Sequence, residues 1–309
     1  MSEPPLIGPR FPHGLPKRWL RLILRRALRA LVSGSRFLFG ENTLALAKLI
    51  LPCLPYGKAV VVASILIEAF PTTTATRAFY CSARPRWGRR FEFRLNPYCP
   101  LSKLFSLTGL YQPEMTKKLS EINQQGTMVD IGANFGYFSV LWLSKSSTEV
   151  IAIEPISQNY ELLTCNVSRF GHRAKTVLCC VGERTGEATM NYDPEYPMLA
   201  KISPNSAQGQ RIKMRHLGDL LEEHVSATIE VLKCDTEGHD VRILRSVPEI
   251  FEKKRVHMLF FEAETWEGER DPGLQDFCQF LASHGYRSVS GKSENDLCYS
   301  VLSKSPLNP

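Results

Sequence analysis

The sequence lacks a run of apolar residues long enough to cross a lipid bilayer. Its most apolar part, residues 44–70, is interrupted by charged residues and prolines. The longest uncharged run there, residues 59–67, is far shorter than the ~20 residues that a spanning helix needs. The opening residues are polar and proline-rich, without the apolar core and cleavage site of a secretory signal. We therefore expect a cytoplasmic protein, with any membrane contact peripheral and made through residues 17–70.

The sequence also lacks the cysteine spacing of a disulfide framework or a zinc site. It has nine cysteines, an odd number, with no C-x-x-C pair and no histidine cluster beside them. Most fall in apolar segments and are interpreted as small core residues. We expect a reducing compartment and no bound metal.

Acidic residues are scarce in the front of the chain. Residues 1–110 hold 17 Lys and Arg against 4 Asp and Glu, whereas the rest of the chain is net acidic. We expect residues 1–16 to be disordered and residues 17–88 to form a basic, mainly helical N-terminal region. The basic amphipathic pattern of residues 17–31 suits either an anionic membrane surface or packing on the chain's own domain. Residues 89–309 form the expected second domain.

A glycine loop follows the apolar stretch at residues 127–131. Gly132 and Gly136 leave room for the backbone to approach a ligand before a helix-like segment resumes. The loop reads D-x-G-x-N-x-G, so it lacks the three glycines of a dinucleotide fingerprint and carries Asp130 at its mouth. A carboxylate there repels a pyrophosphate but suits a sulfonium or an amine. The loop therefore favours S-adenosylmethionine over NAD.

Two further strand ends complete the predicted nucleoside site. Glu154 ends the next apolar stretch, where the diol of a ribose finds a two-oxygen acceptor. Cys180 and Val181 end the third predicted strand, and they suit either the adenine or the core.

Three segments, in this order, resemble the signatures of FkbM-type S-adenosylmethionine-dependent methyltransferases: residues 130–137 (DIGANFGY), 153–155 (IEP) and 232–240 (LKCDTEGHD). Tyr111-Gln112-Pro113-Glu114 is similar to the family's Y-E-P-E lead-in, with Gln112 in place of an acid. The resemblance implies a class I methyltransferase fold and O-methylation, with an acceptor that varies across the family. Together, the residues and the resemblance give these cofactor-binding candidates: Glu114, Asp130, Gly132, Ala133, Asn134, Gly136, Tyr137, Glu154, Pro155, Val181 and Asp235.

Strand and helix patterns alternate after the glycine loop. Strands are expected at 127–131, 149–154, 175–181, 229–235, 256–262, 285–290 and 296–302, with helices at 135–145, 157–170, 240–252 and 273–284 between them. This order predicts an α/β fold with a mostly parallel, seven-stranded, Rossmann-like sheet and helices on both faces, preceded by the helical N-terminal region. The last strand pair predicts an antiparallel member. Residues 182–214 are interpreted as a lid or acceptor-side loop.

Three side chains after the fourth predicted strand are candidates for catalysis. A hydroxyl acceptor must lose its proton, and Asp235, Glu237 or His239 can take it. The alternatives are structural: Asp235 as the cap of a helix beginning near Gly238 and Glu237 as a first-turn acid. Glu262 and Glu264, after the fifth strand, are candidates for acceptor binding or solvated loop acids.

The sequence thus predicts an S-adenosylmethionine-dependent O-methyltransferase acting on a carbohydrate, lipid-linked or natural-product hydroxyl. A nucleic-acid methyltransferase is the first alternative, because the basic front suits phosphates. The acidic catalytic half and the lack of an N-P-P-Y clamp oppose it. The second alternative is a nucleoside-binding scaffold without chemistry, which the acids at positions 130, 154 and 235 oppose.

Overall fold

The structure is a computed structural model. It describes residues 62, 79–83, 91–96, 99–123, 126–145, 147–191, 201–202, 209–226, 228–263, 269–289 and 296–301. The chain divides into two compact units, Met1–Pro71 and Thr72–Pro309, and the description below concerns the second. The expected disorder of residues 1–16 and the helix expected at 17–31 lie outside the described residues, as does Glu264.

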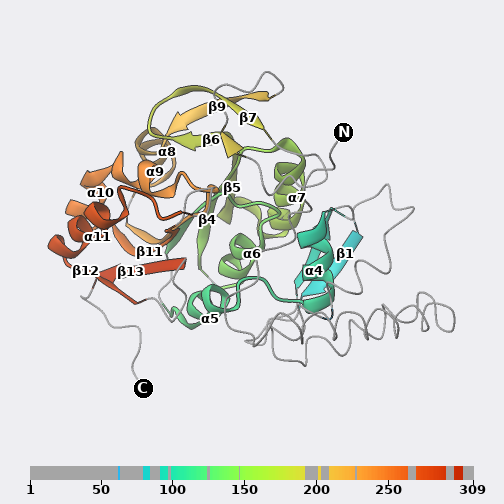
Figure 1. The fold of residues 1–309 in the computed structure, drawn as a ribbon. Helices are drawn as coiled ribbons and strands as arrows, with labels where there is room; N and C mark the ends of the chain where they lie inside the picture. Colours follow the sequence, from blue (N-terminus) through green and yellow to red (C-terminus); the bar gives the residue numbers. More distant parts are fainter. Residues whose placement is uncertain are drawn as a thin grey trace, which may run out of the picture. The chain divides into compact units, whose positions relative to one another are not determined.

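A seven-stranded sheet forms the centre of this unit, in the order β12-β13-β11-β10-β3-β4-β5 (Figure 1). Its strands are β3 (Thr127–Ile131), β4 (Glu149–Glu154), β5 (Ala174–Leu178), β10 (Ile229–Cys234), β11 (Val256–Glu262), β12 (Tyr286–Ser288) and β13 (Asp296–Val301). Neighbouring strands from β11 to β5 are parallel, whereas β13 runs antiparallel to both β11 and β12. The expected mostly parallel α/β sheet is confirmed.

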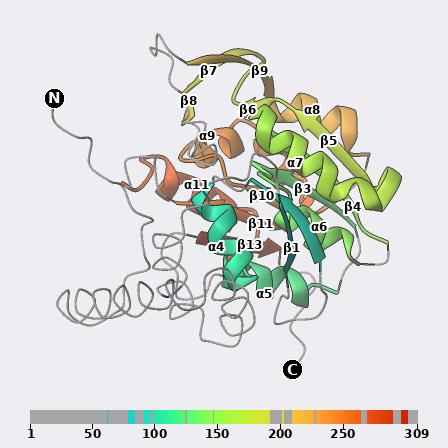
Figure 2. The same cartoon turned by 90° about the vertical axis from the view of Figure 1, so that its right-hand side faces the viewer.

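One face of the sheet carries α4 (Pro100–Thr108), α5 (Pro113–Glu121), α6 (Tyr137–Leu143) and α7 (Ser157–Val167), which η2 (Ser168–Arg173) extends (Figure 2). Every residue of α6 is buried, which is why its sequence is apolar throughout. Side chains from alternate strand positions, including Met128, Val150 and Val231, pack beneath these helices. A hairpin of β1 (Phe79–Ala83) and β2 (Phe91–Leu95) adds Phe93 and Leu95 to the same core.

The other face carries α8 (Leu217–His224), α9 (Asp240–Arg245), α10 (Pro248–Glu252) and α11 (Leu274–Ser283). The intervening strand positions, such as Val129, Ile151 and Leu232, join these helices in the second core. Because successive strand residues point to opposite faces, a strand buried on both faces reads as a continuous apolar run. No helix in the described part of the chain has the length and apolarity needed to cross a bilayer.

The segment expected to be a loop at residues 182–214 contains most of a second sheet. β7 (Gly186–Asn191), β8 (Lys201–Ile202) and β9 (Gln210–His216) join β6 (Cys180–Gly182) in the order β6-β9-β7-β8. The segment expected to be a lid or acceptor-side loop therefore contains strands, and its role at the acceptor side stays a prediction. Alternation along β7 and β9 explains the difference, because Ala188, Met190 and Met214 are buried between neighbours that are partly or fully exposed.

Two predicted elements are each divided in the structure. The strand expected at 175–181 is split because β5 pairs with β4 whereas β6 pairs with β9 of the second sheet. The helix expected at 240–252 ends at Arg245, and α10 starts afresh at Pro248. Proline has no N–H for the helical ladder and disfavours a helical conformation at the preceding Val247, which has φ −132° and ψ 54°.

Candidate active site

A cavity opens at the carboxyl ends of the parallel strands β3, β4 and β10, the edge at which open α/β sheets bind ligands. It is lined by Tyr111, Ile131, Gly132, Ala133, Asn134, Phe135, Tyr137, Phe138, Ile153, Glu154, Pro155, Ile156, Asn159, Cys179, Cys180, Val181, Met190, Ile202, Lys233, Asp235, Thr236, Glu237 and His239. All three signature segments, far apart in the sequence, therefore border one cavity.

The glycine loop is held tightly against the end of β10. Gly132 has φ +71°, and a Cβ atom there would lie 1.9 Å from the carbonyl oxygen of Asp235. The N–H groups of Gly132 and Ala133 both donate to the carbonyl of Ile153 at 3.0 Å. Only glycine allows this combination of a left-handed conformation and a close backbone approach.

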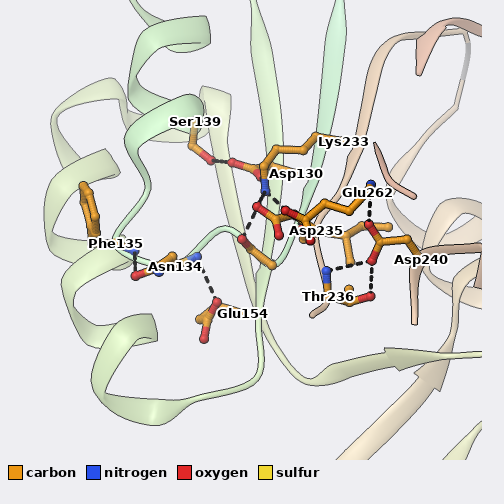
Figure 3. A network of polar contacts seen from close by, with 12 residues as sticks. Asp130, Asn134, Phe135, Ser139, Glu154, Lys233, Asp235, Thr236, Asp240 and Glu262 are labelled. Carbon is orange, nitrogen blue, oxygen red and sulfur yellow. Dashed lines mark hydrogen bonds and ion pairs between the residues drawn. The ribbon is translucent and has the colours of Figure 1, made fainter. Parts of the chain in front are cut away.

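Glu154 is fixed beside the loop by hydrogen bonds from three directions. Its carboxylate accepts from the Asn134 N–H at 2.8 Å (Figure 3). It also accepts from the Ile156 N–H at 3.1 Å and from the Asn159 side-chain amide at 3.3 Å. Burial raises the pKa of Glu154 to about 7, although these hydrogen bonds oppose the rise. Each carboxylate oxygen has further lone pairs, so the fixed group can still accept from a ligand hydroxyl.

Asp130 lies beneath the cavity instead of in its wall. Its side chain is fully buried, and Oδ2 accepts a hydrogen bond from the Ser139 hydroxyl of α6 at 2.6 Å. Oδ1 accepts no hydrogen bond within the described residues and is paired by charge alone with Lys233 Nζ, 3.2 Å away. The carboxylate expected at the mouth of the loop is therefore engaged by the protein itself.

The segment after β10 bends sharply and brings an acid to the cavity wall. Glu237 has φ +55° and Gly238 has φ +94°, and such a left-handed conformation at a non-glycine residue is a strain often found at functional sites. Burial raises the pKa of Glu237 to about 8, and the nearby carboxyls of Asp235 and Asp240 add to the rise. Glu237 is therefore an acid that can exchange a proton near neutral pH.

Asp240 anchors this bend from behind. It accepts hydrogen bonds from the Thr236 N–H at 2.8 Å, from the Thr236 hydroxyl and from the Glu262 N–H at 2.9 Å (Figure 3). Burial raises its pKa to about 7, and the Asp235 charge contributes to the same rise. The backbone of Glu262 thereby ties the end of β11 to the wall of the cavity.

The remaining two candidates for catalysis also line the cavity. The Asp235 Oδ2 lies 3.4 Å from Lys233 Nζ, and α9 begins only at Asp240, so Asp235 does not cap it. His239 precedes α9 without a side-chain capping hydrogen bond. Burial lowers the pKa of His239, and the Arg242 charge lowers it further.

The structure brings most of the predicted site residues together, but not all. Three cofactor-binding candidates are absent from the cavity lining: Asp130 and Gly136 are buried outside it, and Glu114 is exposed on α5. Glu262, a candidate for acceptor binding, is absent from the lining as well. The lining residues without a predicted role include Tyr111, Asn159 and Lys233. Lys233 had a signal, because it lies in the third signature segment two residues before Asp235, on the same side of the strand.

The described residues contain no cluster of His, Cys, Asp or Glu arranged to hold a metal ion. Cys179 and Cys180 form no disulfide, and both line the cavity. Burial raises the pKa of Cys180 to about 12 and that of Cys179 to about 11. These thiols therefore stay protonated and act as apolar side chains in the cavity wall, not as nucleophiles.

Known proteins share sequence similarity with the part of the chain that forms this cavity. The family model described as the methyltransferase FkbM domain matches residues 130–288. The 31-O-demethyl-FK506 methyltransferase FkbM of Streptomyces tacrolimicus is 22% identical over 202 residues, which cover 55% of this chain and 76% of that protein.

Two methyltransferases are among the solved structures that match part of the chain. Precorrin-6y C5,15-methyltransferase from Geobacter metallireducens GS-15 matches with a TM-score of 0.36 and 14% identity over 62% of this chain and 89% of its own. TrmK of M. capricolum, in complex with S-adenosyl-homocysteine, matches with a TM-score of 0.35 and 12% identity over 62% of this chain and 69% of its own.

The family model spans just over half of the chain and all three signature segments that border the cavity. The expected class I, Rossmann-like methyltransferase fold agrees with the strand order and the antiparallel β13. The chain therefore belongs to the family defined by the methyltransferase FkbM domain.

Proposed function

We propose that this chain is an S-adenosylmethionine-dependent methyltransferase that methylates a hydroxyl of a carbohydrate, lipid-linked or natural-product acceptor. The observation that carries the proposal is the charge of the cavity wall. Glu154, Asp235 and Glu237 line it, and Lys233, its lysine, is engaged by acids. Such a wall suits a cationic sulfonium and opposes the pyrophosphate of a dinucleotide.

The strand order supports an assignment of residues to the two ends of the cofactor. Glu154 ends β4 and would accept the hydroxyls of the ribose, with Pro155 next to it. Val181, on β6, would border the adenine. Gly132, Ala133 and Asn134 lie between these residues and Asp235, which directly follows β10 and where the amino-acid end would lie.

S-adenosylmethionine supplies an electrophilic methyl group on a positively charged sulfur. The chain must hold the acceptor oxygen in line with that group and remove its proton. We assign the proton to Glu237, because its raised pKa suits a base near neutral pH, whereas Asp235 faces a lysine. As the acceptor oxygen forms its bond to the methyl carbon, the sulfur–carbon bond would break and release S-adenosylhomocysteine, and the hydroxyl proton would pass to the Glu237 carboxylate.

The acidic wall also distinguishes between acceptor classes. A nucleic acid brings phosphates, which the Asp235 carboxylate would repel, whereas an uncharged hydroxyl brings no such penalty. We therefore favour a neutral hydroxylated acceptor over a nucleic acid.

Calorimetric titration with S-adenosylhomocysteine, with NAD as the control, tests the cofactor assignment without an acceptor. We expect micromolar binding of S-adenosylhomocysteine alone. Binding of NAD in its place would refute the assignment. A screen of glycans, lipids and polyketides with a labelled methyl donor then tests the hydroxyl acceptor.

Glu237→Gln tests the base. We expect the variant to bind S-adenosylhomocysteine within about twofold of the wild type but to transfer methyl groups roughly 10²–10⁴-fold more slowly, the range for loss of a general base. Asp235→Asn is the comparison, and a larger loss of turnover in that variant would move the base to Asp235.

A further inference from the structure

Lys233 and Asp130 are brought together by strand register. The two residues are direct partners in the parallel pairing of β10 with β3. Partners in register point to the same face of a sheet, and alternate residues of one strand share a face, so Asp235 continues on the side of Lys233. This is the α6 face, because Ser139 of α6 donates to Asp130.

The Lys233 ammonium connects the glycine loop to the end of β10. Nζ lies 3.2 Å from Asp130 Oδ1, 3.4 Å from Asp235 Oδ2 and 3.2 Å from the Gly132 carbonyl oxygen (Figure 3). All three distances exceed the 2.7–2.9 Å of a close charge-assisted hydrogen bond. The ammonium therefore bridges two carboxylates and the loop, and it forms no close hydrogen bond with any single one of them.

The two carboxylates differ in access to the cavity. Lys233 and Asp235 line it, whereas Asp130 is fully buried and does not. Burial alone lowers the pKa of Lys233, but the charges of Asp130 and Asp235 more than reverse this, so its pKa lies above the ordinary value. A permanent positive charge therefore stands between Asp130 and any ligand.

The order of the strands places this group at one end of the ligand. Glu154 ends β4, on one side of β3, and Asp235 follows β10, on the other side. A nucleoside bound at Glu154 would extend its amino-acid end across Gly132 toward Asp235. That end carries an amino group, for which the Asp235 carboxylate is a suitable partner.

We propose, resting on the proposed function, that Lys233 is a positioning residue through which Asp130 acts: the buried pair fixes Asp235 where it binds the amino-acid end of the cofactor. Asp130 then contributes to binding only by holding Lys233. This role differs from the direct contact with the cofactor that the sequence predicts for Asp130.

A double-mutant cycle on the full chain tests whether Asp130 acts through Lys233. The variants are Asp130→Asn, Lys233→Met and the pair together. The probes are S-adenosylhomocysteine and 5′-methylthioadenosine, which lacks the amino-acid end. We expect Lys233→Met to weaken S-adenosylhomocysteine at least tenfold and to leave 5′-methylthioadenosine within twofold. The paired variant should bind no more weakly than Lys233→Met alone.

The comparison of two ligands separates positioning from general damage to the fold, which would weaken both equally. Glu154→Gln is the matched control, because a ribose contact is shared by both probes and should weaken both. Lys233→Met leaves Asp130 buried without a counter-charge. If this variant does not fold, the paired variant, in which that charge is removed, carries the same ligand comparison.

Two results would overturn the inference. One is an equal loss of affinity for both probes in the Lys233 variants. The other is a loss of affinity in the paired variant that equals the product of the losses in Asp130→Asn and Lys233→Met. Failure of the wild-type chain to bind either probe would instead refute the proposed cofactor, and with it this inference.

Discussion

At the scale of single residues, the glycine loop depends on one missing side chain. Gly132 combines φ +71° with a position where a Cβ would lie 1.9 Å from a backbone carbonyl oxygen. A flexible side chain can move aside, but the carbonyl of Asp235 belongs to the segment that forms the cavity wall. A methyl group at position 132 would therefore distort both sides of the cavity.

We expect Gly132→Ala to lower the free energy of unfolding by about 2–4 kcal/mol, from backbone strain and overpacking together, and to abolish binding of S-adenosylhomocysteine. Urea unfolding and calorimetry measure the two effects. Gly285→Ala is the control, because Gly285 also has a positive φ, +85°, but its Cβ would meet only the end of Lys254 at ordinary contact distance. Equal losses in both variants would show that strain alone is responsible.

Glu154 gives the unliganded chain a dependence on pH. Because burial raises its pKa from 4.5 to about 7 in the folded state, the folded chain keeps a proton that the unfolded chain releases. This contribution to stability is complete below pH 4.5 and is lost as the pH rises through about 7, with a slope of about 1.4 kcal/mol per pH unit between them. Glu154→Gln should remove that slope in urea unfolding from pH 5 to 7. Parallel pH profiles of variant and wild type would contradict the assignment.

Several residues of the site follow from sequence, and others need the fold. The acids at strand ends could be located because parallel strands end at one edge. The burial of Asp130 could not be predicted from the sequence, because it depends on the register of β10 against β3. Glu114 was included through resemblance alone, and the structure leaves it exposed on α5.

At the scale of elements, the bounds of a strand or helix are predicted correctly where its whole length lies in one environment, such as a sheet buried on both faces. β3, β4 and β11 have the expected bounds, because their apolar runs are buried on both faces. The sequence alone could not show that β5 and β6 are two strands, because one apolar stretch contributes a strand to each of two sheets. The order of the second sheet depends on pairing between distant segments.

The second sheet supplies part of the cavity wall. Met190 of β7 and Ile202 of β8 line the cavity, and Met190 packs with Ile156 and Cys180 near the proposed nucleoside end. We expect Met190→Ala to weaken S-adenosylhomocysteine and 5′-methylthioadenosine by the same factor, roughly tenfold. The reason is that the truncated side chain loses its contacts with the ligand, each atom pair contributing about 0.1–0.2 kcal/mol.

Ile212→Ala is the matched control for this element. Ile212, on β9, packs against the same cluster but does not line the cavity. It should lower stability and leave both affinities unchanged. If the two variants weaken binding alike, the second sheet acts on the site through its stability alone.

At the scale of the whole molecule, charge is divided along the chain. The basic excess lies in residues 1–110, whereas the cavity wall, in the second unit, is acidic. Residues 1–40 belong to the first compact unit, Met1–Pro71. The predicted membrane contact and the methyltransferase site therefore occupy separate parts of the chain.

Deleting residues 1–40 should leave the affinity for S-adenosylhomocysteine unchanged and reduce association with vesicles that contain anionic lipids. The physical reason is the loss of the basic residues in that stretch, each worth about 1 kcal/mol near an anionic surface. Sedimentation with anionic and with neutral vesicles measures the association. Equal sedimentation of the deleted and the full chain would refute the peripheral contact.

The antiparallel strand β13 imposes an order of assembly. It comes after β12 in the chain yet lies between β12 and β11, and β12 has no other neighbour in the seven-stranded sheet. On the ribosome, β12 must wait for residues 296–301 to emerge before it can join the sheet. The strands that border the cavity, β10, β3 and β4, pair with one another without them. The nascent chain can therefore pair the strands that border the cavity first and add the edge strand β12 last.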